Sequence, residues 1–413
     1  MKVLVIGSGG REHAIADAFS RSSKINAIIV SPGNAGIAQE YRCEKLGEFS
    51  AILDFCHQEA VDLVFIGPEQ PIQEGLSDYL REHEIKVLAP SRLAARLETS
   101  KFFAKQIMFQ HQVPTAKYVL ISDQDQAADI IADFNYPVVL KADGLAAGKG
   151  VIICSDELEA KKACADLFGQ SAGKTGILAE EYLSGWEVSL FAFCDGQRYL
   201  TSLFAQDHKQ LYEQDQGPNT GGMGAICPVP QAEEYRSEIE TQILEPVLKA
   251  MNELGCPYQG ILYLGLMITN QGPKVIEFNC RLGDPETQVL LPLLKTDFLE
   301  ICLAIIEHRL PDIKLEWEEQ TAITVVLAAP GYPGKYKKGI AIDVPKLKSK
   351  VFFAGVQNSE SGLISSGGRV LAVMNKADTL KQARASVYQD IEAIRFADKV
   401  YRKDIGQRTN LLK

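Results

Sequence analysis

The stretch Val275-Ile-Glu-Phe-Asn-Cys-Arg-Leu-Gly-Asp-Pro-Glu286 starts as an apolar strand and ends in a dense group of polar side chains. Alternation along a strand predicts that Glu277, Asn279 and Arg281 point to one face. Two hard oxygen ligands beside a guanidinium are typical of a site where a magnesium nucleotide transfers its phosphate. The alternative is an ordinary buried strand with polar ends, but Glu and Asn inside an apolar strand need a partner.

A glycine-rich segment precedes this strand. Gln206-Asp-His-Lys-Gln210 leads into Asp215-Gln-Gly-Pro-Asn-Thr-Gly-Gly-Met-Gly224, which reads as a loop with four glycines and a proline. Such a loop supplies backbone N–H groups and tolerates positive φ, which suits close contact with a small anionic ligand.

The totals indicate a multidomain globular protein. A chain of 413 residues is too long for one core and predicts about two to four domains. Hydrophobic and charged contents of 46% and 23% are ordinary for such a protein. The net charge of −10 argues against a nucleic-acid partner, which normally binds a basic surface.

Cysteine usage and the first residues predict a cytoplasmic location. The nine cysteines form no C-x-x-C pair and no cluster with histidine, so neither zinc nor a disulfide framework is indicated. The chain opens with the strand Met1-Lys-Val-Leu-Val-Ile6, which leaves no room for a signal peptide. No apolar run is long enough to span a membrane, so we expect no membrane partner.

The first hundred residues alternate strand and helix. Strands are expected over 3–6, 27–30, 63–66 and 87–89, with helices over 11–19, 49–59 and 73–84. This order predicts an open parallel sheet with helices on both faces.

The rest of the chain reads as α+β. A helix from Thr99 carries Lys101 and Lys105 on one face. Strands are then expected over 137–141, 151–154 and 176–182 with a helix over 157–167. A third stretch, about 188–309, holds the two segments quoted above, and the final part has strands over 324–328, 351–354 and 369–374 and a helix over 380–394.

The N-terminal glycines predict a phosphate site. In Val3-Leu-Val-Ile-Gly7-Ser-Gly9-Gly10-Arg11-Glu12-His13 a strand runs through a glycine turn into a helix. The dinucleotide fingerprint needs a third glycine where this chain has Glu12, and the next strand ends at Asn34 without a ribose-binding acid. We therefore disfavour a dehydrogenase and predict a phosphomonoester on the amides of Gly7, Gly9 and Gly10 and on Arg11. Glycines needed only for a tight turn are the alternative.

Two more loops follow strands in this half, Pro32-Gly-Asn34 and Gly67-Pro-Glu69-Gln-Pro71. Strand C-terminal ends of an open α/β sheet share one crevice, so these loops strengthen the prediction of a small-molecule site.

A second glycine loop lies at Val138-Val-Leu-Lys141-Ala-Asp-Gly144-Leu-Ala-Ala-Gly148-Lys149-Gly150, between two strands. It can fold over a triphosphate while Lys141 and Lys105 neutralise charge. It is not a P-loop, because Gly150 follows Lys149. Ala179-Glu-Glu181-Tyr-Leu183 suits adenine recognition by backbone groups, and Glu187 is placed for ribose hydroxyls. Alternatively, these acids are solvated strand-end charges.

Taken together, these motifs resemble the ATP-grasp superfamily and, within it, the phosphoribosylamine–glycine ligase family. The resemblance covers essentially the whole chain, with Gly217–Gly224 the most specific motif and Gly331-Tyr-Pro-Gly334, Ser366-Gly-Gly-Arg-Val370 and Tyr401–Gly406 also matching. It implies an α/β and α+β multidomain fold: an N-terminal substrate-binding domain (1–105), an ATP-grasp domain (106–320) with a mobile lid at about 121–189, and a small C-terminal α+β domain (321–413).

The resemblance also implies an activity and its residues. Glycine would react with ATP to give glycyl phosphate, and 5-phosphoribosylamine would displace phosphate to give glycinamide ribonucleotide, in a monomer. Lys141 and Arg281 would be catalytic. ATP would be held by Lys105, Lys141, Gly144, Gly148, Lys149, Gly150, Glu181, Leu183 and Glu187. Magnesium or manganese would sit on Glu277 and Asn279. The two other substrates would contact Gly7, Gly9, Gly10, Arg11, Asn34, Glu69, Asp207, Thr220, Gly221, Gly222, Arg281 and Asp284.

One position supports this family and two segments depart from it. Many ATP-grasp proteins carry a further acid on the strand before Glu277, where this chain has Leu264; the glycine ligase family also lacks that acid. The family usually has Gly-Glu-Glu where this chain has Gly185-Trp186-Glu187, and an arginine with Asp-Gly-Asp where it has Gln210-Leu-Tyr-Glu-Gln-Asp215. The alternatives are another ATP-grasp ligase with a different carboxylate and amine, and a catalytically silent nucleotide-binding protein.

Overall fold

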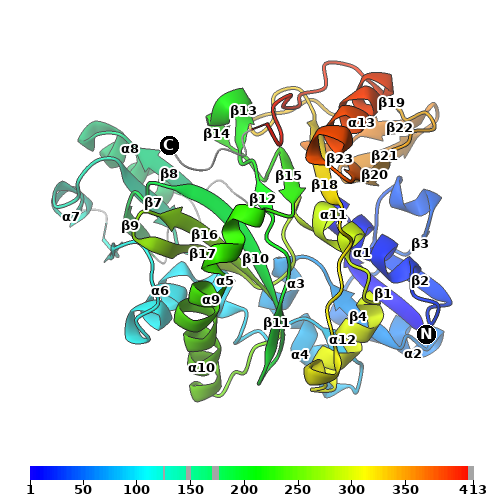
Figure 1. Cartoon of the computed structure of the whole chain (residues 1–413), viewed down its shortest axis with the longest axis horizontal. Coiled ribbons are helices and arrows are strands. Elements are labelled where there is room, and N and C mark those ends of the chain that lie inside the picture. The colour runs from blue at the N-terminus through cyan, green and yellow to red at the C-terminus, as the bar shows by residue number, and fades with distance from the viewer. Residues whose placement is uncertain (124–125, 146–149, 170–175, 408–413) are drawn as a thin grey trace.

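The structure is a computed structural model that describes residues 1–123, 126–145, 150–169 and 176–407. Figure 1 shows the N-terminal sheet and the C-terminal elements on one side of the molecule, with α7 (Ala127–Ala132) and α8 (Glu157–Phe168) on the opposite side. The predicted multidomain α/β and α+β fold is confirmed. Within the described ranges no helix is long and apolar enough to cross a bilayer.

The N-terminal sheet is parallel throughout, in the order β3-β2-β1-β4-β5. Val3 and Val5 share a buried cluster with Phe19 of α1, whereas Leu4 belongs to the cluster that includes Leu53 of α2. Helices therefore cover both faces, as predicted. The strands are β1 (Lys2–Gly7), β2 (Ala27–Pro32), β3 (Arg42–Cys43), β4 (Leu63–Ile66) and β5 (Val87–Leu88), and the first helices are α1 (Gly10–Ser20) and α2 (Phe49–Glu59).

The helix predicted over 73–84 was wrong in its limits. The chain instead forms α3 (Glu69–Glu74) and α4 (Leu76–Glu82), separated by Gly75 at φ 97°. Glycine adopts this left-handed conformation readily, so it ends α3 and lets the chain turn before α4.

A second sheet, here called the lid sheet, has the antiparallel order β6-β9-β7-β8. Its strands are β6 (Tyr118–Ile121), β7 (Val138–Ala142), β8 (Val151–Cys154) and β9 (Ile177–Glu181), and it shares a separate buried cluster with α7 and α8. The unit thus spans 118–181 rather than the predicted 121–189, because Trp186 already opens a strand of the next sheet.

That next sheet, here called the central sheet, has the order β11-β10-β16-β17. Along β10, Leu190 joins the cluster that contains Met251 of α10, and Phe191 joins the cluster that contains Phe298 of α12. The elements are β10 (Trp186–Asp195), β11 (Tyr199–Thr201), β16 (Gln259–Thr269), β17 (Gly272–Asn279), α5 (Arg96–Thr99), α6 (Lys101–Gln110), α9 (Arg236–Ile239), α10 (Glu245–Glu253), α11 (Thr287–Leu290) and α12 (Phe298–Ile306).

The C-terminal sheet crosses the predicted boundary at 320/321. Its order is β12-β15-β18-β23-β20, so β12 (Gln206–Asp207) and β15 (Gly224–Cys227) pair within the same sheet as β18 (Thr321–Ala328), β20 (Lys350–Phe353) and β23 (Arg369–Ala377). Helix α13 (Leu380–Ala393) packs on β23 and β18, and the remaining strands are β19 (Ile342–Asp343), β21 (Val356–Ser359), β22 (Gly362–Ser365) and β24 (Arg395–Phe396). The domain division remains a proposal.

The glycine-rich segment predicted as a loop is partly stranded. Residues Gln210–Tyr212 (β13) and Gln216–Asn219 (β14) form a two-stranded hairpin, and β15 begins at Gly224. Only Thr220–Met223 forms the connecting turn, and this turn faces the cleft described next.

Candidate active site

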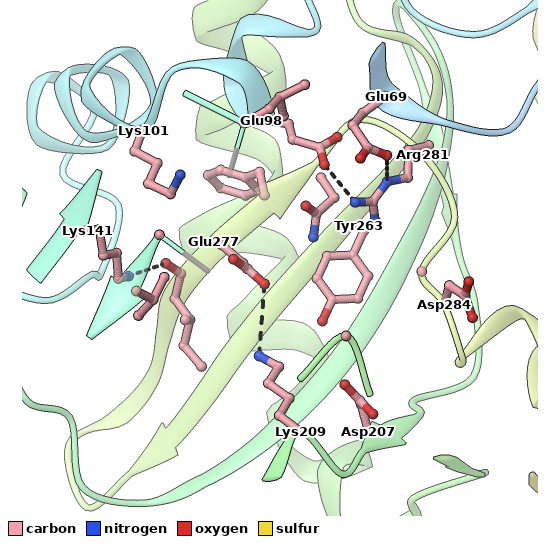
Figure 2. A pocket seen from close by; sticks show the side chains of 18 of the residues that line it. Glu69, Glu98, Lys101, Lys141, Asp207, Lys209, Tyr263, Glu277, Arg281 and Asp284 are labelled. Carbon is pink, nitrogen blue, oxygen red and sulfur yellow. Dashed lines mark hydrogen bonds and ion pairs between the residues drawn. The ribbon is translucent and has the colours of Figure 1, made fainter. Parts of the chain in front are cut away.

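A cleft of about 440 Å³ opens where the lid sheet, the central sheet, the N-terminal domain and β23 meet (Figure 2). Of the predicted site residues, those lining it are Arg11, Glu69, Lys105, Lys141, Gly144, Gly150, Asp207, Thr220, Gly221, Glu277, Asn279, Arg281 and Asp284. The fold therefore gathers residues from both ends of the chain into one polar cavity.

The other predicted residues lie around this cleft. Glu181, Leu183 and Glu187 line an adjoining hollow, and Gly9 and Gly10 line another. Gly7, Asn34 and Gly222 line none of these three. Gly148 and Lys149 lie outside the described residues.

Two buried lysines share one carboxylate at the lid side. Glu180 lies 2.9 Å from Lys141 Nζ and 3.3 Å from Lys105 Nζ. Burial lowers the pKa of Lys105 to about 8, even though Glu180 opposes the shift. The sequence prediction named Glu181 and not Glu180. Along β9 the side chains alternate, so Glu180 points inward, whereas Glu181 pairs with Lys274 at 3.6 Å.

Glu277 and Asn279 lie two residues apart on β17, so they share the face predicted for them. Their partners on β16 are Gly265 opposite Glu277 and Tyr263 opposite Asn279. The assignment of Leu264 to the missing acid was wrong, because Leu264 pairs with Phe278 and is buried in the core behind the sheet. Gly265 stands at the position that faces Glu277.

This pair fits a magnesium ion held mainly by its nucleotide. Burial raises the pKa of Glu277, but the nearby Lys209, Lys141 and Lys101 outweigh it and hold the pKa below its ordinary value. The carboxylate is therefore a charged oxygen ligand. Among the described residues no cluster of three His, Cys, Asp or Glu forms a metal cage, and magnesium usually takes one or two protein ligands plus phosphate oxygens.

Lys209, between β12 and β13, lines the cleft beside two acids of the central sheet and was not predicted as a site residue. Its ammonium is 2.7 Å from Glu187 Oε2. It is also 3.9 Å from Glu277 Oε1 (Figure 2). One cation thus pairs with the predicted ribose acceptor and faces the predicted metal ligand. The Asp207-His-Lys209 motif was the sequence feature that could have identified Lys209 as a site residue.

Arg281 lies between two carboxylates at the N-terminal side of the cleft (Figure 2). Its Nη2 is 2.7 Å from Glu98 Oε1 and its Nε is 3.1 Å from Glu69 Oε2. Burial raises the pKa of Glu69, but Arg281 and Arg11 outweigh it and hold the pKa at about 2. Glu98 belongs to no sequence motif and was therefore not predicted as a site residue.

Asp207 faces a second acid. Burial, and then the negative charge of Glu286, raise the pKa of Asp207 well above its ordinary value. Glu286 accepts a hydrogen bond from Ser189 Oγ at 2.9 Å, and Ser189 lies 3.0 Å from the hydroxyl of Tyr263. This part of the cleft can therefore donate or accept protons close to the glycine-rich turn.

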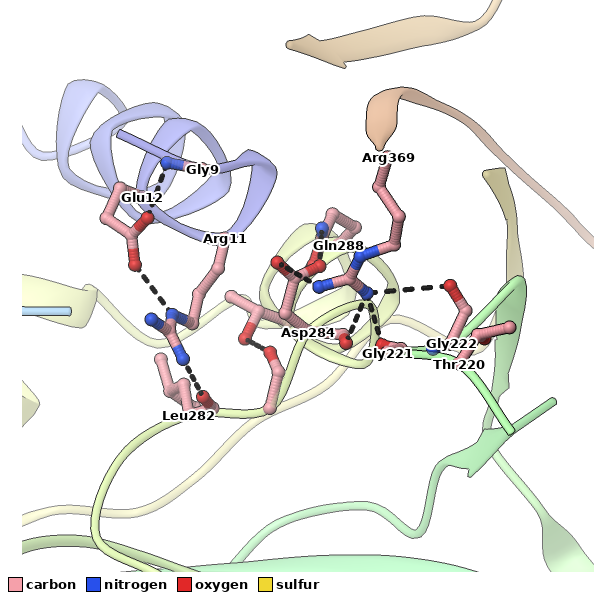
Figure 3. Close-up of polar contacts among 12 residues, drawn as sticks. Gly9, Arg11, Glu12, Thr220, Gly221, Gly222, Leu282, Asp284, Gln288 and Arg369 are labelled. Carbon is pink, nitrogen blue, oxygen red and sulfur yellow. Dashed lines mark hydrogen bonds and ion pairs between the residues drawn. The ribbon is translucent and has the colours of Figure 1, made fainter. Parts of the chain in front are cut away.

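Arg369, from the C-terminal sheet, holds the glycine-rich turn in place (Figure 3). Its guanidinium donates to the carbonyl oxygens of Gly221 and Asp284 and pairs with the Asp284 carboxylate at 3.1 Å. A Cβ on Gly222, at φ 105°, would lie 2.4 Å from Pro285 Cδ, so this turn requires glycine. The Ser366–Val370 motif was the sequence signal for Arg369.

The N-terminal glycines accommodate Glu12. Its carboxylate accepts from Gly9 N at 2.7 Å and from Arg11 Nε at 2.6 Å (Figure 3). A Cβ on Gly7 would lie 2.3 Å from Glu12 Cγ, which explains why glycine is needed there. The amides of Gly10 and Arg11 open α1 and have no acceptor within the helix.

The side chain of Asn34 binds backbone groups rather than facing the cleft. Its Nδ2 donates to Ser8 O at 2.8 Å and Phe353 O at 2.9 Å, and its Oδ1 accepts from Gly36 N and Ile37 N. All its usual hydrogen bonds are thus in use, and Asn34 joins the N-terminal loop to the C-terminal sheet.

Both departures from the usual family sequence lie outside the cleft. Trp186 is 9% exposed and packs in the buried cluster that contains Leu190 and Met251. Gln210 belongs to the β13–β14 hairpin, where its carbonyl accepts from Arg402 at 3.1 Å. Neither side chain lines the cleft or the two adjoining hollows.

Family models cover nearly the whole chain: the N domain of phosphoribosylglycinamide synthetase matches 1–98, its ATP-grasp (A) domain 99–287 and its C domain 322–408. A phosphoribosylamine–glycine ligase of Caldanaerobacter subterraneus subsp. tengcongensis is 46% identical over 98% of this chain and 99% of its own length. The chain belongs to the phosphoribosylamine–glycine ligase family.

Structures and fused relatives agree with this membership. The crystal structure of phosphoribosylamine–glycine ligase from Thermotoga maritima is 33% identical with a TM-score of 0.87, over 98% of this chain and 100% of that one. A human trifunctional purine biosynthetic protein is 41% identical over 98% of this chain and 42% of its own length. A biotin carboxylase domain from Hydrogenobacter thermophilus, at 18% identity and a TM-score of 0.72 over 97% of this chain and 91% of that one, shares the fold alone.

Proposed function

We propose that this protein is an ATP-dependent ligase that joins glycine to 5-phosphoribosylamine, giving glycinamide ribonucleotide, ADP and phosphate for purine synthesis. The observation that carries the proposal is the convergence on one cleft of Lys141 from β7, Glu277 from β17 and Arg281 from the loop that follows β17. Family membership supports the choice of substrates.

The first step would transfer the γ-phosphate to glycine. A glycine carboxylate oxygen attacks phosphorus as the bond to the ADP oxygen breaks, which gives glycyl phosphate. Lys105 and Lys141 are placed to neutralise the phosphates, and Arg281 to hold the reacting oxygens, because phosphoryl transfer depends mainly on alignment and charge. Glu181, Leu183 and Glu187 would surround the nucleoside, with Gly144 and Gly150 near the phosphates.

A divalent metal on Glu277 and Asn279 would supply further charge neutralisation between the phosphates. The preference for magnesium or manganese belongs to the same proposal.

The second step would form the amide. The amine nitrogen of phosphoribosylamine attacks the acyl carbon, the bond to the phosphate oxygen breaks, and the nitrogen gives up one proton. Asp207, whose pKa burial raises well above its ordinary value, lies beside the glycine-rich turn and would hold that proton. Excluding water matters here because an acyl phosphate hydrolyses readily.

The phosphoribosylamine site would extend to the N-terminal loop. A hollow of about 280 Å³ lies beside Gly9, Gly10, Gln288 and Arg369. The first amides of α1 favour a phosphate there. Buried Gln288 donates a hydrogen bond from Nε2 to Asp284 Oδ1 at 2.8 Å. Its Oε1 has no hydrogen-bond partner and suits a sugar hydroxyl.

A cytoplasmic monomer completes the proposal. The nine cysteines are all free, as expected of a protein in a reducing compartment.

ADP release with ATP and magnesium tests the function, with glycine and phosphoribosylamine added separately and together. The amine can be made in the assay from ribose 5-phosphate and ammonia. Release only with both substrates is the expected result. Release with a different carboxylate or amine would replace the substrates, and ATP binding without release would indicate a silent nucleotide-binding protein.

Lys141→Met and Glu277→Gln test the residues. Each should lower kcat on the order of 10²- to 10³-fold while the thermal midpoint stays near that of the unmodified protein, because each removes one preorganised charge. Near-normal turnover in either variant would refute the role of that residue.

A further inference from the structure

We infer that Glu98 is a positioning residue that fixes Arg281 for the phosphate-transfer step, whereas Glu69, on the same guanidinium, is left to contact substrate. The inference rests on the proposed role of Arg281. Glu98 belongs to none of the sequence motifs that mark the site.

Glu98 fixes both the backbone and the side chain of the segment that carries Arg281. Its Oε1 accepts from Arg281 Nη2 at 2.7 Å, and its Oε2 accepts from Cys280 N at 2.7 Å. One carboxylate thus sets where residue 280 lies and where the next side chain points. Charge-assisted hydrogen bonds are stronger than neutral ones, so Glu98 holds this segment firmly.

Glu98 is itself held rigidly. Its helix α5 packs on β17 and leads directly into α6, which carries Lys105. The neighbouring Leu97 is 1% exposed and lies in the main core. Glu98 therefore fixes Arg281 relative to the same helix that presents a phosphate-binding lysine.

The two carboxylates on Arg281 differ in access to the cleft. The Glu98 side chain is 6% exposed, whereas that of Glu69 is 29% exposed. Glu69 is also shared, since it lies 3.1 Å from Arg281 and 3.9 Å from Arg11. Both acids line the cleft, but Glu98 is nearly buried, so a substrate amine or hydroxyl reaches Glu69 more readily and the two acids divide the work of binding and positioning.

Glu98→Gln is the decisive substitution because both carboxylate oxygens face donors. An amide has one acceptor, so its NH₂ must meet either Cys280 N or Arg281 and break that contact. We expect kcat to fall about 10- to 100-fold, since a displacement of about 1 Å can cost 10²-fold. Apparent KM values for ATP and phosphoribosylamine should stay within about threefold. Glu69→Gln should instead raise the apparent KM for phosphoribosylamine.

A matched control separates positioning from a general loss of stability. Asp404 also accepts from an arginine, Arg402 at 2.8 Å, and from a backbone amide, Gln214 N at 2.8 Å, outside the cleft. Asp404→Asn should lower the thermal midpoint but leave kcat within about twofold. An equal kcat loss in both variants would refute positioning.

A double-mutant cycle identifies the residue through which Glu98 acts. Arg281→Lys keeps the charge but loses the planar fork. If Glu98 works through Arg281, adding Glu98→Gln to that variant should cost less than about threefold more, whereas multiplied losses would overturn the inference. Normal activity of Arg281→Lys would refute the proposed role of Arg281 instead. Should Glu98→Gln not fold, Glu98→Asp, with two oxygens on a shorter stem, takes its place in the same cycle.

Discussion

Replacing Lys209 by methionine should tighten metal binding to the nucleotide-bound protein while slowing turnover. The ammonium lies 3.9 Å from Glu277 Oε1, so it competes with a metal for that carboxylate. It also lies 2.7 Å from Glu187 Oε2 and holds the Glu187 side chain in place. Methionine keeps much of the length of the side chain and removes the charge. Turnover should fall on the order of 10²-fold, because the cleft loses a cation beside Glu277, where the transferred phosphate is proposed to bind.

The size of the metal effect follows from the distance. Two unit charges 3.9 Å apart interact with about 4 kcal/mol at an effective dielectric constant of about 20. The Lys209 side chain is 24% exposed, so solvent and salt reduce the realised effect to about 1–2 kcal/mol. The apparent dissociation constant for Mg²⁺ should therefore drop roughly 5- to 30-fold.

Turnover against free Mg²⁺ at saturating ATP gives the apparent metal constant, and Mn²⁺ binding by calorimetry with ADP present measures it without turnover. Lys376→Met is the control, because Lys376 pairs with Glu318 at 3.7 Å and does not line the cleft. Metal affinity that is unchanged or weaker in Lys209→Met would refute the competition.

Other outcomes test the pKa shifts and the glycine-rich turn. Because burial holds the pKa of Lys105 at about 8, kcat/KM for ATP should fall as pH rises above 8, and Lys105→Arg should move that fall upward; a flat profile in the unmodified protein contradicts this. Gly222→Ala should lower the thermal midpoint and raise KM for glycine. The control Gly255→Ala, at φ 70° with nothing within 4 Å of its Cβ, should show only the conformational cost of about 1 kcal/mol. Equal effects of the two substitutions would exclude the clash between residue 222 and Pro285. Glu69 ionised in the folded state stabilises the protein above its ordinary pKa of 4.5, and this contribution of at most about 3 kcal/mol is lost as pH falls towards 2. Glu69→Gln should therefore lower the thermal midpoint at pH 7 more than at pH 3.

Local patterns in the sequence predicted much of the secondary structure. The strands at 63–66 and 151–154 and the helix at 49–59 have the predicted limits. These segments follow one periodicity between clear stop signals, so neighbouring residues alone determine them. The helix expected over 73–84 instead breaks at Gly75, because the left-handed conformation of one glycine outweighs the helical period around it.

Register between strands was beyond the sequence. Leu264 was named as the residue that replaces the further acid on the preceding strand, but a bulge between Gly265 and Leu266 sets the pairing so that Gly265 lies opposite Glu277. A shift of one residue moves a side chain to the other face of a sheet. Pairing of β16 with β17 therefore decides which residue faces the proposed metal ligands.

The family, the order of the elements and the polar residues of the motifs could be predicted from the sequence, because glycine turns, strand alternation and charged strand ends are local. The pairing of those residues depends on how distant segments pack. Glu98 reaches Arg281 across 183 residues, and Arg369 reaches Gly221 across 148. The physical reason is that a buried charge needs a counter-charge wherever the chain can bring one, and packing, not sequence distance, supplies it.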